Sequence, residues 1–317
     1  MEFYKNSGAV TVSGLIMTIL AGGVTAAVLG VVYTFAIVYI PFIYINFLLT
    51  AGFALVLGLV TAKAAYIGKI RNGMVVGLCG FMSGLFGLYV AWATDPMARG
   101  AEVCAFQPGL LLSYVQFFYE NGAWGLGRNG DNISGIFLAL VWLIEAAVIV
   151  GGAALISGGA NLGKTFCERC HQWTSLEKGL SRLSIADSAD ETLERVLGGD
   201  LAGLADMIRV NSDEDVYLRV DLATCGTCSE SNFMSLVLVT HGVDDKGKAT
   251  VETQNMIENM IVDEQQVPLL HDAGRDLSPE ELAKKESDAT PQPGDLDFLD
   301  KPQNKADDFK PEDLNIS

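Results

Sequence analysis

Residues 6–62 read NSGAVTVSGLIMTILAGGVTAAVLGVVYTFAIVYIPFIYINFLLTAGFALVLGLVTA, and none of their side chains carries a charge. As a single helix this run would be about 85 Å long, whereas about 20 residues suffice to cross a bilayer core. The run must therefore fold back on itself. Pro41 is the expected break, because proline disfavours helix at its own position and at the one before it. The stretch predicts two membrane spans, at about 13–40 and 43–66.

Two further apolar stretches are long enough to cross a membrane, at about 73–93 and 133–157. Residues 1–160 are therefore expected to form a domain of four spans. The first span is too long for the apolar core of a signal peptide, so we expect it to remain as an anchor. Between spans three and four lies the predicted outer loop 94–132. Its apolar stretch between Pro108 and Gly122 is too short to span and predicts an interfacial or re-entrant helix.

Charge divides the chain into two unlike halves. The 317 residues carry 21 Lys+Arg and 38 Asp+Glu, a formal net charge of −17. Residues 1–160 are balanced, so the whole excess of acid lies in residues 161–317. This distribution excludes a single soluble globule. It also argues against a nucleic-acid partner, because phosphate contacts need a basic surface.

Lys and Arg near the ends of the spans predict the orientation in the membrane, because such residues are enriched in cytoplasmic segments. Only Arg99 and Arg128 lie in the outer loop. The bases expected on the opposite side are Lys5, Lys63, Lys69, Arg71, Lys164, Arg169, Lys178 and Arg182. We therefore expect a multi-pass protein with both termini in the cytoplasm.

Glu145, in LVWLIEAAVIV, is an ionisable residue in the middle of the fourth span. A charged carboxylate there is costly, so an intramembrane acid marks a candidate functional residue. One interpretation is an ion or substrate site. The favoured interpretation is a structural one, in which a protonated Glu145 forms a hydrogen bond with a backbone carbonyl or with Asn46. Lys63 lies near the inner end of its span, where its amine can reach the interface, so direct pairing with Glu145 is an open alternative.

Glycines recur at helical spacings in the spans, in the pairs Gly73/Gly77, Gly80/Gly84 and Gly23/Gly30. Small residues let helices approach closely in lipid. They indicate either a homo-oligomer interface or, as we favour, packing inside one four-helix bundle.

Two C-x-x-C pairs follow the fourth span: Cys167 with Cys170, and Cys225 with Cys228 after 54 intervening residues. This pattern predicts one structural zinc ion per chain with four thiolate ligands. Gly226 is expected to allow a tight turn in the second pair. His171 is a competing ligand that we set aside, because its place beside Cys170 needs a different backbone path. A redox C-x-x-C is the rival interpretation, but a reducing cytoplasm favours a metal.

The soluble half, residues 161–271, is expected to be a small α+β domain that resembles a zinc ribbon. Alternation predicts strands at Val216–Leu222, 233–241 and 248–254. Segment 187–209 predicts two short helices broken at Gly198 and Gly199, as an insertion between the cysteine pairs. Residues 272–317 are acidic and proline-rich, which predicts a disordered tail. Its motifs, such as DLDFLD at 295–300, are partner-docking candidates, although a solubilising tail is the favoured interpretation.

Several motifs resemble those of uncharacterised bacterial inner-membrane proteins that combine four transmembrane helices with a cytoplasmic zinc ribbon. They are FYKNSGAVTVSGLI, YIPFIYINFLLTAGF, VWLIEA and the CERC and CGTC pairs. The resemblance covers about residues 1–265. It implies a location in the cell inner membrane and the zinc-ribbon fold, and it implies no activity.

The sequence lacks the common catalytic motifs, such as a P-loop, GxSxG or HExxH. The leading hypothesis is a non-enzymatic inner-membrane protein that presents a cytoplasmic zinc-ribbon domain, with the lipid bilayer and other proteins as partners. The partner proteins would bind the ribbon domain and the acidic tail. The alternative is a small transporter or channel that uses Glu145 as its intramembrane site. A thiol-redox membrane enzyme is a weaker alternative.

Overall fold

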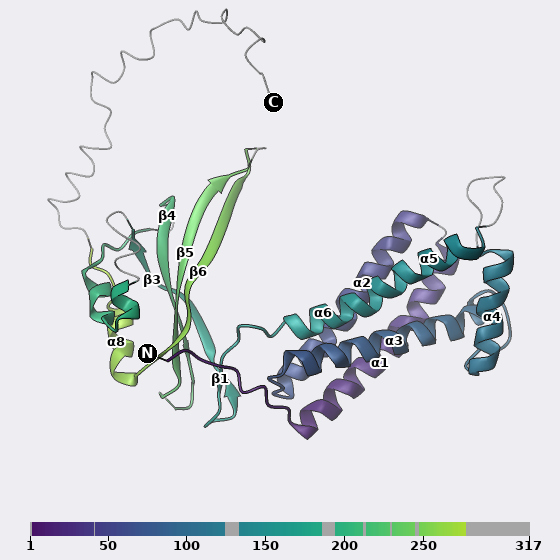
Figure 1. The fold of residues 1–317 in the computed structure, drawn as a ribbon, viewed down its shortest axis with the longest axis horizontal. Coiled ribbons are helices and arrows are strands. Elements are labelled where there is room, and N and C mark those ends of the chain that lie inside the picture. Colours follow the sequence, from purple (N-terminus) through teal and green to yellow (C-terminus); the bar gives the residue numbers. More distant parts are fainter. Residues whose placement is uncertain are drawn as a thin grey trace, which may run out of the picture. The chain divides into compact units, whose positions relative to one another are not determined.

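A computed structural model describes residues 2–40, 42–123, 133–185, 194–211, 214–228, 230–244 and 247–276. Its elements are a group of long helices and a sheet of long strands, with shorter helices and strands beside them (Figure 1). Contacts divide the chain into two compact units. The first holds the apolar helices, both cysteine pairs and the adjoining ends of the strands. The second holds the remainder of the sheet and the short helices at Leu201–Asp206 and Val267–His271. The expected domain boundaries and the acidic tail stay predictions, and residues 277–317 lie outside the described part.

Four helices are long and apolar enough to cross a membrane, which confirms this part of the expected fold class. Three are continuous: α1 (Val12–Tyr39), α2 (Ile43–Ile67) and α3 (Gly73–Ala98). The fourth consists of α5 (Gly135–Ala146), the π-helical turn η1 (Ala147–Gly151) and α6 (Gly152–Gly159). Pro41, the expected break, lies outside the described residues, and the helices on either side of it end at Tyr39 and begin at Ile43.

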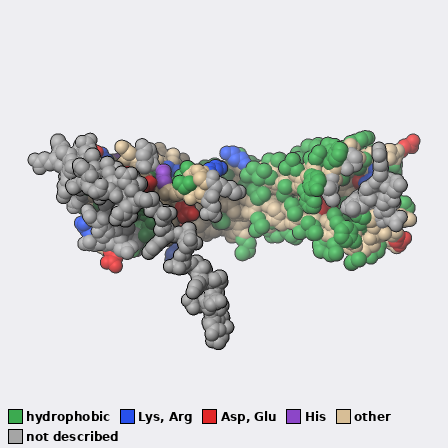
Figure 2. All heavy atoms as spheres, turned by 90° about the horizontal axis from the view of Figure 1, so that it is seen from above, with side chains coloured by type: hydrophobic (Ala, Val, Ile, Leu, Met, Phe, Trp, Pro, Cys, Tyr) green, Lys and Arg blue, Asp and Glu red, His purple; other side chains and the backbone are tan. Residues whose placement is uncertain are grey.

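The surface of the helical part is apolar, and hydrophobic side chains cover the face seen in Figure 2. Tyr44 and Met74 are each 86% exposed, and Leu155 is 78% exposed. Such a surface is costly in water, because apolar area removed from water contributes about 25 cal/mol per Å². Together with the length of the helices, it indicates a membrane protein.

Helix α3 runs to Ala98, five residues beyond the predicted end of the third span at about residue 93. Asp95 and Pro96 lie in its last turn. In the structure, the Asp95 carboxylate accepts hydrogen bonds from Arg99 Nε at 2.7 Å and from the Tyr114 hydroxyl at 2.6 Å. A carboxylate with two such partners can remain on the helix. Tyr114 belongs to α4 (Pro108–Asn121), which confirms the helix expected within the outer loop.

The bundle helices pack through their glycines. Helix α1 packs on α2 and α3, and α6 packs on the same two helices. The backbones come so close that a Cβ atom on Gly80 would lie 2.2 Å from Ser157 Oγ and 2.6 Å from the Ala153 carbonyl oxygen. A Cβ on Gly30 would lie 2.7 Å from the carbonyl oxygen of Gly87. These glycines serve packing inside the bundle, as expected, whereas Gly23 has open space beside it.

The Gly80→Ala substitution is expected to destabilise the helical part by about 1–3 kcal/mol, because the added methyl group overpacks the α3–α6 contact. Gly23→Ala is the matched control, since a Cβ there meets no atom within 4 Å. Thermal unfolding of the two purified variants in the same detergent measures the difference. Equal melting temperatures for both variants would contradict the packing described here.

The sheet contains four antiparallel strands in the order β3-β4-β5-β6. Strands β4 (Val216–Thr224), β5 (Asn232–Val243) and β6 (Ala249–Val262) confirm the three expected strands. Strand β3 (Ser175–Ser184) was not expected. Its centre is Glu177-Lys178-Gly179, which interrupts the apolar alternation, and Gly179 has φ of +70°.

The expected helical insertion lies partly outside the described residues, which resume at residue 194. Residues 194–197 are helical, a turn follows at 198–199, and η2 (Leu201–Asp206) is a 3₁₀ helix. The expected break at the glycine pair is therefore correct, although the second piece is not an α-helix. After β6 the chain forms a short 3₁₀ turn, η3 (Glu264–Gln266), and then helix α8 (Val267–His271).

Candidate metal centre

Both cysteine pairs lie at the ends of strands. Strands β1 (Phe166–Cys167) and β2 (Gln172–Trp173) form a small antiparallel hairpin, and Cys170 lies in its turn. Cys225 follows the last residue of β4, and Cys228 precedes β5. His171 takes a left-handed conformation with φ of +50°. Hairpin turns therefore carry each pair of thiols to one place.

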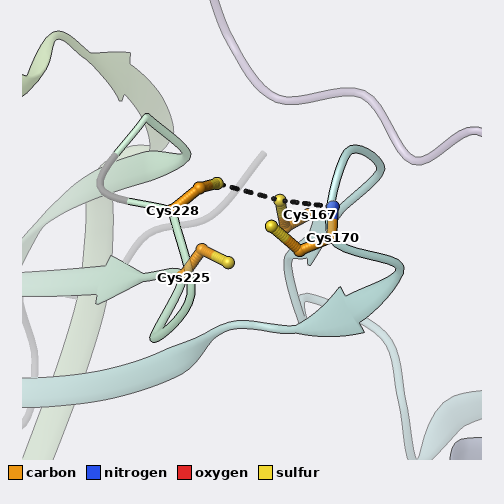
Figure 3. Close-up of side chains that lie close together, drawn as sticks. All are labelled: Cys167, Cys170, Cys225 and Cys228. Atoms are coloured by element: carbon orange, nitrogen blue, oxygen red, sulfur yellow. Dashed lines mark hydrogen bonds between the residues drawn. The ribbon is translucent and has the colours of Figure 1, made fainter.

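The four cysteine side chains converge on one another (Figure 3). All four Sγ atoms lie within 4.8 Å of one another, and those of Cys167 and Cys228 are 3.6 Å apart. Four sulfurs bound to zinc at about 2.3 Å are about 3.8 Å apart at the corners of a tetrahedron. The observed cluster thus needs only small adjustments to hold a metal ion. The four residues that were predicted as ligands are brought together, and His171 does not belong to the cluster.

Hydrogen bonds orient the sulfurs from outside the cluster. Ser231 Oγ donates to Cys167 Sγ at 3.2 Å, and the backbone N–H of Cys170 points to the same sulfur at 3.4 Å. Gln172 Nε2 donates to Cys225 Sγ at 3.1 Å. Outer contacts of this kind fix the direction of metal ligands. Ser231 and Gln172 were not anticipated from the sequence, where only their closeness to the cysteines could have indicated them.

The close sulfurs have opposite pKa shifts. Burial raises the pKa of Cys225, but hydrogen bonds from the backbone N–H groups of Cys228 and Thr227 outweigh burial and lower the pKa to about 6. Contact with Cys228, followed by burial, raises the pKa of Cys170 to about 12. The thiolate of Cys225 is thus stabilised, whereas a second thiolate at Cys170 in the same cluster is unfavourable. A cation would relieve this repulsion, since thiolates are the metal-binding form of cysteine.

Gly226 does not have the expected role. Its φ lies outside the left-handed region, and a Cβ atom there would meet nothing within 4 Å. The turn between Cys225 and Cys228 is instead closed by a hydrogen bond from the Cys225 N–H to the Ser231 carbonyl at 3.1 Å. The remaining cysteines lie elsewhere: Cys79 is buried on α3, and Cys104 donates towards the sulfur of Met97.

The first cysteine hairpin docks on the turn between α2 and α3 through Arg71. The Arg71 side chain is only 7% exposed, and its Nη1 donates to Glu168 Oε2 at 2.6 Å. Its guanidinium carbon also lies 4.2 Å from the ring centre of Phe166. Glu168 lies between the two cysteines of the first pair. A charged group of the membrane part therefore contacts the first cysteine hairpin directly.

An aromatic contact reinforces the same docking. Trp173 Nε1 donates to the Tyr66 carbonyl at 2.8 Å, and the two rings stack 5.0 Å apart at 11°. The amine of Lys164 lies 4.5 Å from the ring centre of Tyr66. Tyr66 is in the last turn of α2, and Trp173 is in β2. The first cysteine hairpin is thus joined to the C-terminal end of α2 by a hydrogen bond to the backbone, by ring stacking and by a charge contact.

Glu145 lies on α5 and is half-buried. It does not belong to the cysteine cluster. Its carboxyl group is hydrogen-bonded to the hydroxyl of Tyr33 on α1. The expected partner was therefore wrong, because Asn46 Oδ1 is buried without a hydrogen bond in the described part of the chain. Lys63 lies instead over the ring of Tyr66, at 5.3 Å. Tyr33 has no charge or motif that could have marked it in the sequence.

Comparisons with models of protein families, with curated proteins and with solved structures find no match to this chain. The four apolar helices and the cysteine cluster fit the resemblance drawn from the sequence motifs. The family itself stays a prediction.

Proposed function

We propose that the protein is a non-enzymatic inner-membrane protein that presents a zinc-ribbon domain to protein partners in the cytoplasm. The observation that supports this proposal is the cluster of four cysteine sulfurs within 4.8 Å. Zinc bound by four protein ligands has no open position for a substrate, which is typical of structural rather than catalytic sites. Four thiolates in a reducing compartment also favour the binding of zinc over the formation of disulfides.

The docking of the first hairpin on the α2–α3 turn supports the idea of presentation. Arg71 and Trp173 attach the metal-binding turn to the membrane part. A domain held in this way would meet its partners at the membrane surface rather than on a free tether. The acidic tail is the second candidate contact for partners, and it lies outside the described residues.

Partner binding is tested by crosslinking the full-length chain in native membranes and identifying what is captured. We expect a defined protein to be crosslinked to the wild type and to Cys79→Ser, and to be lost from Cys225→Ser. Cys79→Ser is the matched control, because Cys79 is buried on α3 away from the cluster. Identical captures by all three proteins would contradict a role for the metal-binding domain in recognition.

The proposed orientation places both termini and both cysteine pairs in the cytoplasm. Eight bases flank that side of the helices, against two in the outer loop. We expect a reporter that is active only in the cytoplasm to be active when fused after residue 170 or at the C-terminus. A fusion within 94–107 should be inactive. A signal from outside the membrane for the fusion after residue 170 would overturn the orientation.

A small transporter or channel is the second candidate function, and the partly buried contact between Glu145 and Tyr33 favours it. Acids with partners inside a membrane commonly line ion or substrate paths. If this candidate is correct, reconstituted protein should carry a flux that Glu145→Gln abolishes while the metal content stays unchanged. A thiol-redox enzyme remains the weaker alternative, and it requires cysteines that cycle between thiol and disulfide without a metal.

A further inference from the structure

Four oxygen atoms from three helices form a chain of contacts inside the membrane part. The Glu145 carboxyl on α5 contacts the Tyr33 hydroxyl on α1. That hydroxyl lies 2.8 Å from Thr50 Oγ1 on α2, and Thr50 Oγ1 lies 2.8 Å from the carbonyl oxygen of Asn46. The chain thus contains three contacts, each short enough to be a hydrogen bond.

The number of hydrogens determines the protonation state of Glu145. Two oxygens this close need one hydrogen between them, so three contacts need three hydrogens. Tyr33 and Thr50 each supply one hydroxyl hydrogen, and the Asn46 carbonyl supplies none. An ionised Glu145 only accepts, which would leave one contact without a hydrogen. A protonated Glu145 donates to Tyr33, Tyr33 then donates to Thr50, and Thr50 donates to Asn46.

The surroundings oppose a charge on Glu145. Tyr33 is 6% exposed, and its ring lies edge-on to Phe53 with the ring centres 5.4 Å apart. No Lys, Arg or His in the described part forms an ion pair with Glu145. Arg99, at the C-terminal end of α3, is already paired with Asp95. A second negative charge without a base is unfavourable in an apolar interior.

We infer that Glu145 is a proton-binding site of the membrane domain, with Tyr33 as the acceptor of its proton and with Thr50 and the Asn46 carbonyl as the acceptors further along the chain. The π-helical turn η1 begins two residues after Glu145, and such turns are frequent at functional sites. The ligand of the site is the proton itself. The inference is independent of the metal site, and it holds whether or not the protein carries a flux.

Infrared spectroscopy of the full-length protein in lipid tests this inference at neutral pH. The difference between wild type and Glu145→Gln should contain the carbonyl band of one protonated carboxylic acid, sensitive to deuterium exchange. Thr50→Val breaks the chain and should shift that band. Thr61→Val is the matched control, because Thr61 is a buried threonine on α2 that donates only to the carbonyl of Leu57. It should leave the band in place.

A lipid-soluble carbodiimide gives a second readout that does not depend on the folding of any variant. The protonated carboxyl group adds across a C=N bond of the reagent, and its proton passes to one nitrogen atom. The acyl group then migrates from oxygen to the other nitrogen atom, which leaves a stable N-acylurea on the side chain. We expect one adduct per wild-type chain, located at Glu145 by peptide mass spectrometry. Carboxylate bands in place of the acid band, together with no adduct at Glu145, would show that the residue is ionised and would overturn the inference.

Discussion

Replacing Cys170 or Cys225 by serine is expected to release the metal from the full-length chain and to unfold the cysteine hairpins. Three remaining thiolates and a water molecule form an open site, which binds structural zinc less tightly. In zinc-finger peptides the bound metal contributes about 10–16 kcal/mol, so most of the stability of such a small domain depends on it. The metal content per chain and resistance to limited proteolysis after residue 164 measure the two effects.

Cys79→Ser and Cys104→Ser are the matched controls for this prediction. Both cysteines are free and lie outside the cluster. These variants should keep the metal and the protease resistance of the wild type. The prediction fails if Cys170→Ser and Cys225→Ser retain a full complement of metal, or if they lose it and still resist the protease as the wild type does.

The Arg71→Ala substitution is expected to loosen the first cysteine hairpin from the membrane part. It removes the ion pair with Glu168 and the guanidinium contact with the ring of Phe166. Glu168 is half-exposed, so water screens its charge and can solvate it once Arg71 is lost. We therefore expect the docking of this hairpin to weaken by about 1–3 kcal/mol, mainly because the contact between the buried guanidinium and the Phe166 ring is lost. The rate at which a coloured chelator removes zinc should rise accordingly.

Arg169 supplies a control on the same hairpin. It pairs with Glu230, but both side chains are largely exposed, at 66% and 59%. Pairs of this kind contribute little, so Arg169→Ala should lose zinc at nearly the wild-type rate. Equal rates for Arg71→Ala and the wild type would show that the docking on the α2–α3 turn does not support the metal-binding hairpin.

The helices could be predicted because lipid imposes a simple rule on sequence. A segment that crosses a bilayer must be long and nearly free of charge, and residues 6–62 satisfy that rule without any knowledge of their neighbours. The rule does not indicate how far α3 continues as a helix beyond the apolar segment. Asp95 is charged, but its partners Arg99 and Tyr114 allow the helix to continue. Arg99 lies at the helical i+4 spacing from Asp95, whereas no periodicity in the sequence indicates the contact with Tyr114.

The cysteine cluster could be predicted because each cysteine pair is a local pattern, whereas the contacts that support the cluster are not local. Each C-x-x-C pair is recognisable within four residues. Arg71 and Glu168 are 97 positions apart, and Tyr33 and Glu145 are 112 apart. Only the folded chain brings such residues together. Arg71 had been interpreted solely as a marker of orientation, which describes its charge but not its burial against Phe166.

X-ray absorption at the zinc edge, combined with the metal content of the purified full-length chain, tests the central claim most directly. One zinc per chain surrounded by four sulfur atoms at about 2.3 Å is the expected result. A folded chain that contains no metal and keeps Cys167, Cys170, Cys225 and Cys228 as free thiols or disulfides would contradict it. A zinc ion surrounded by nitrogen or oxygen atoms in place of these sulfurs would contradict it equally.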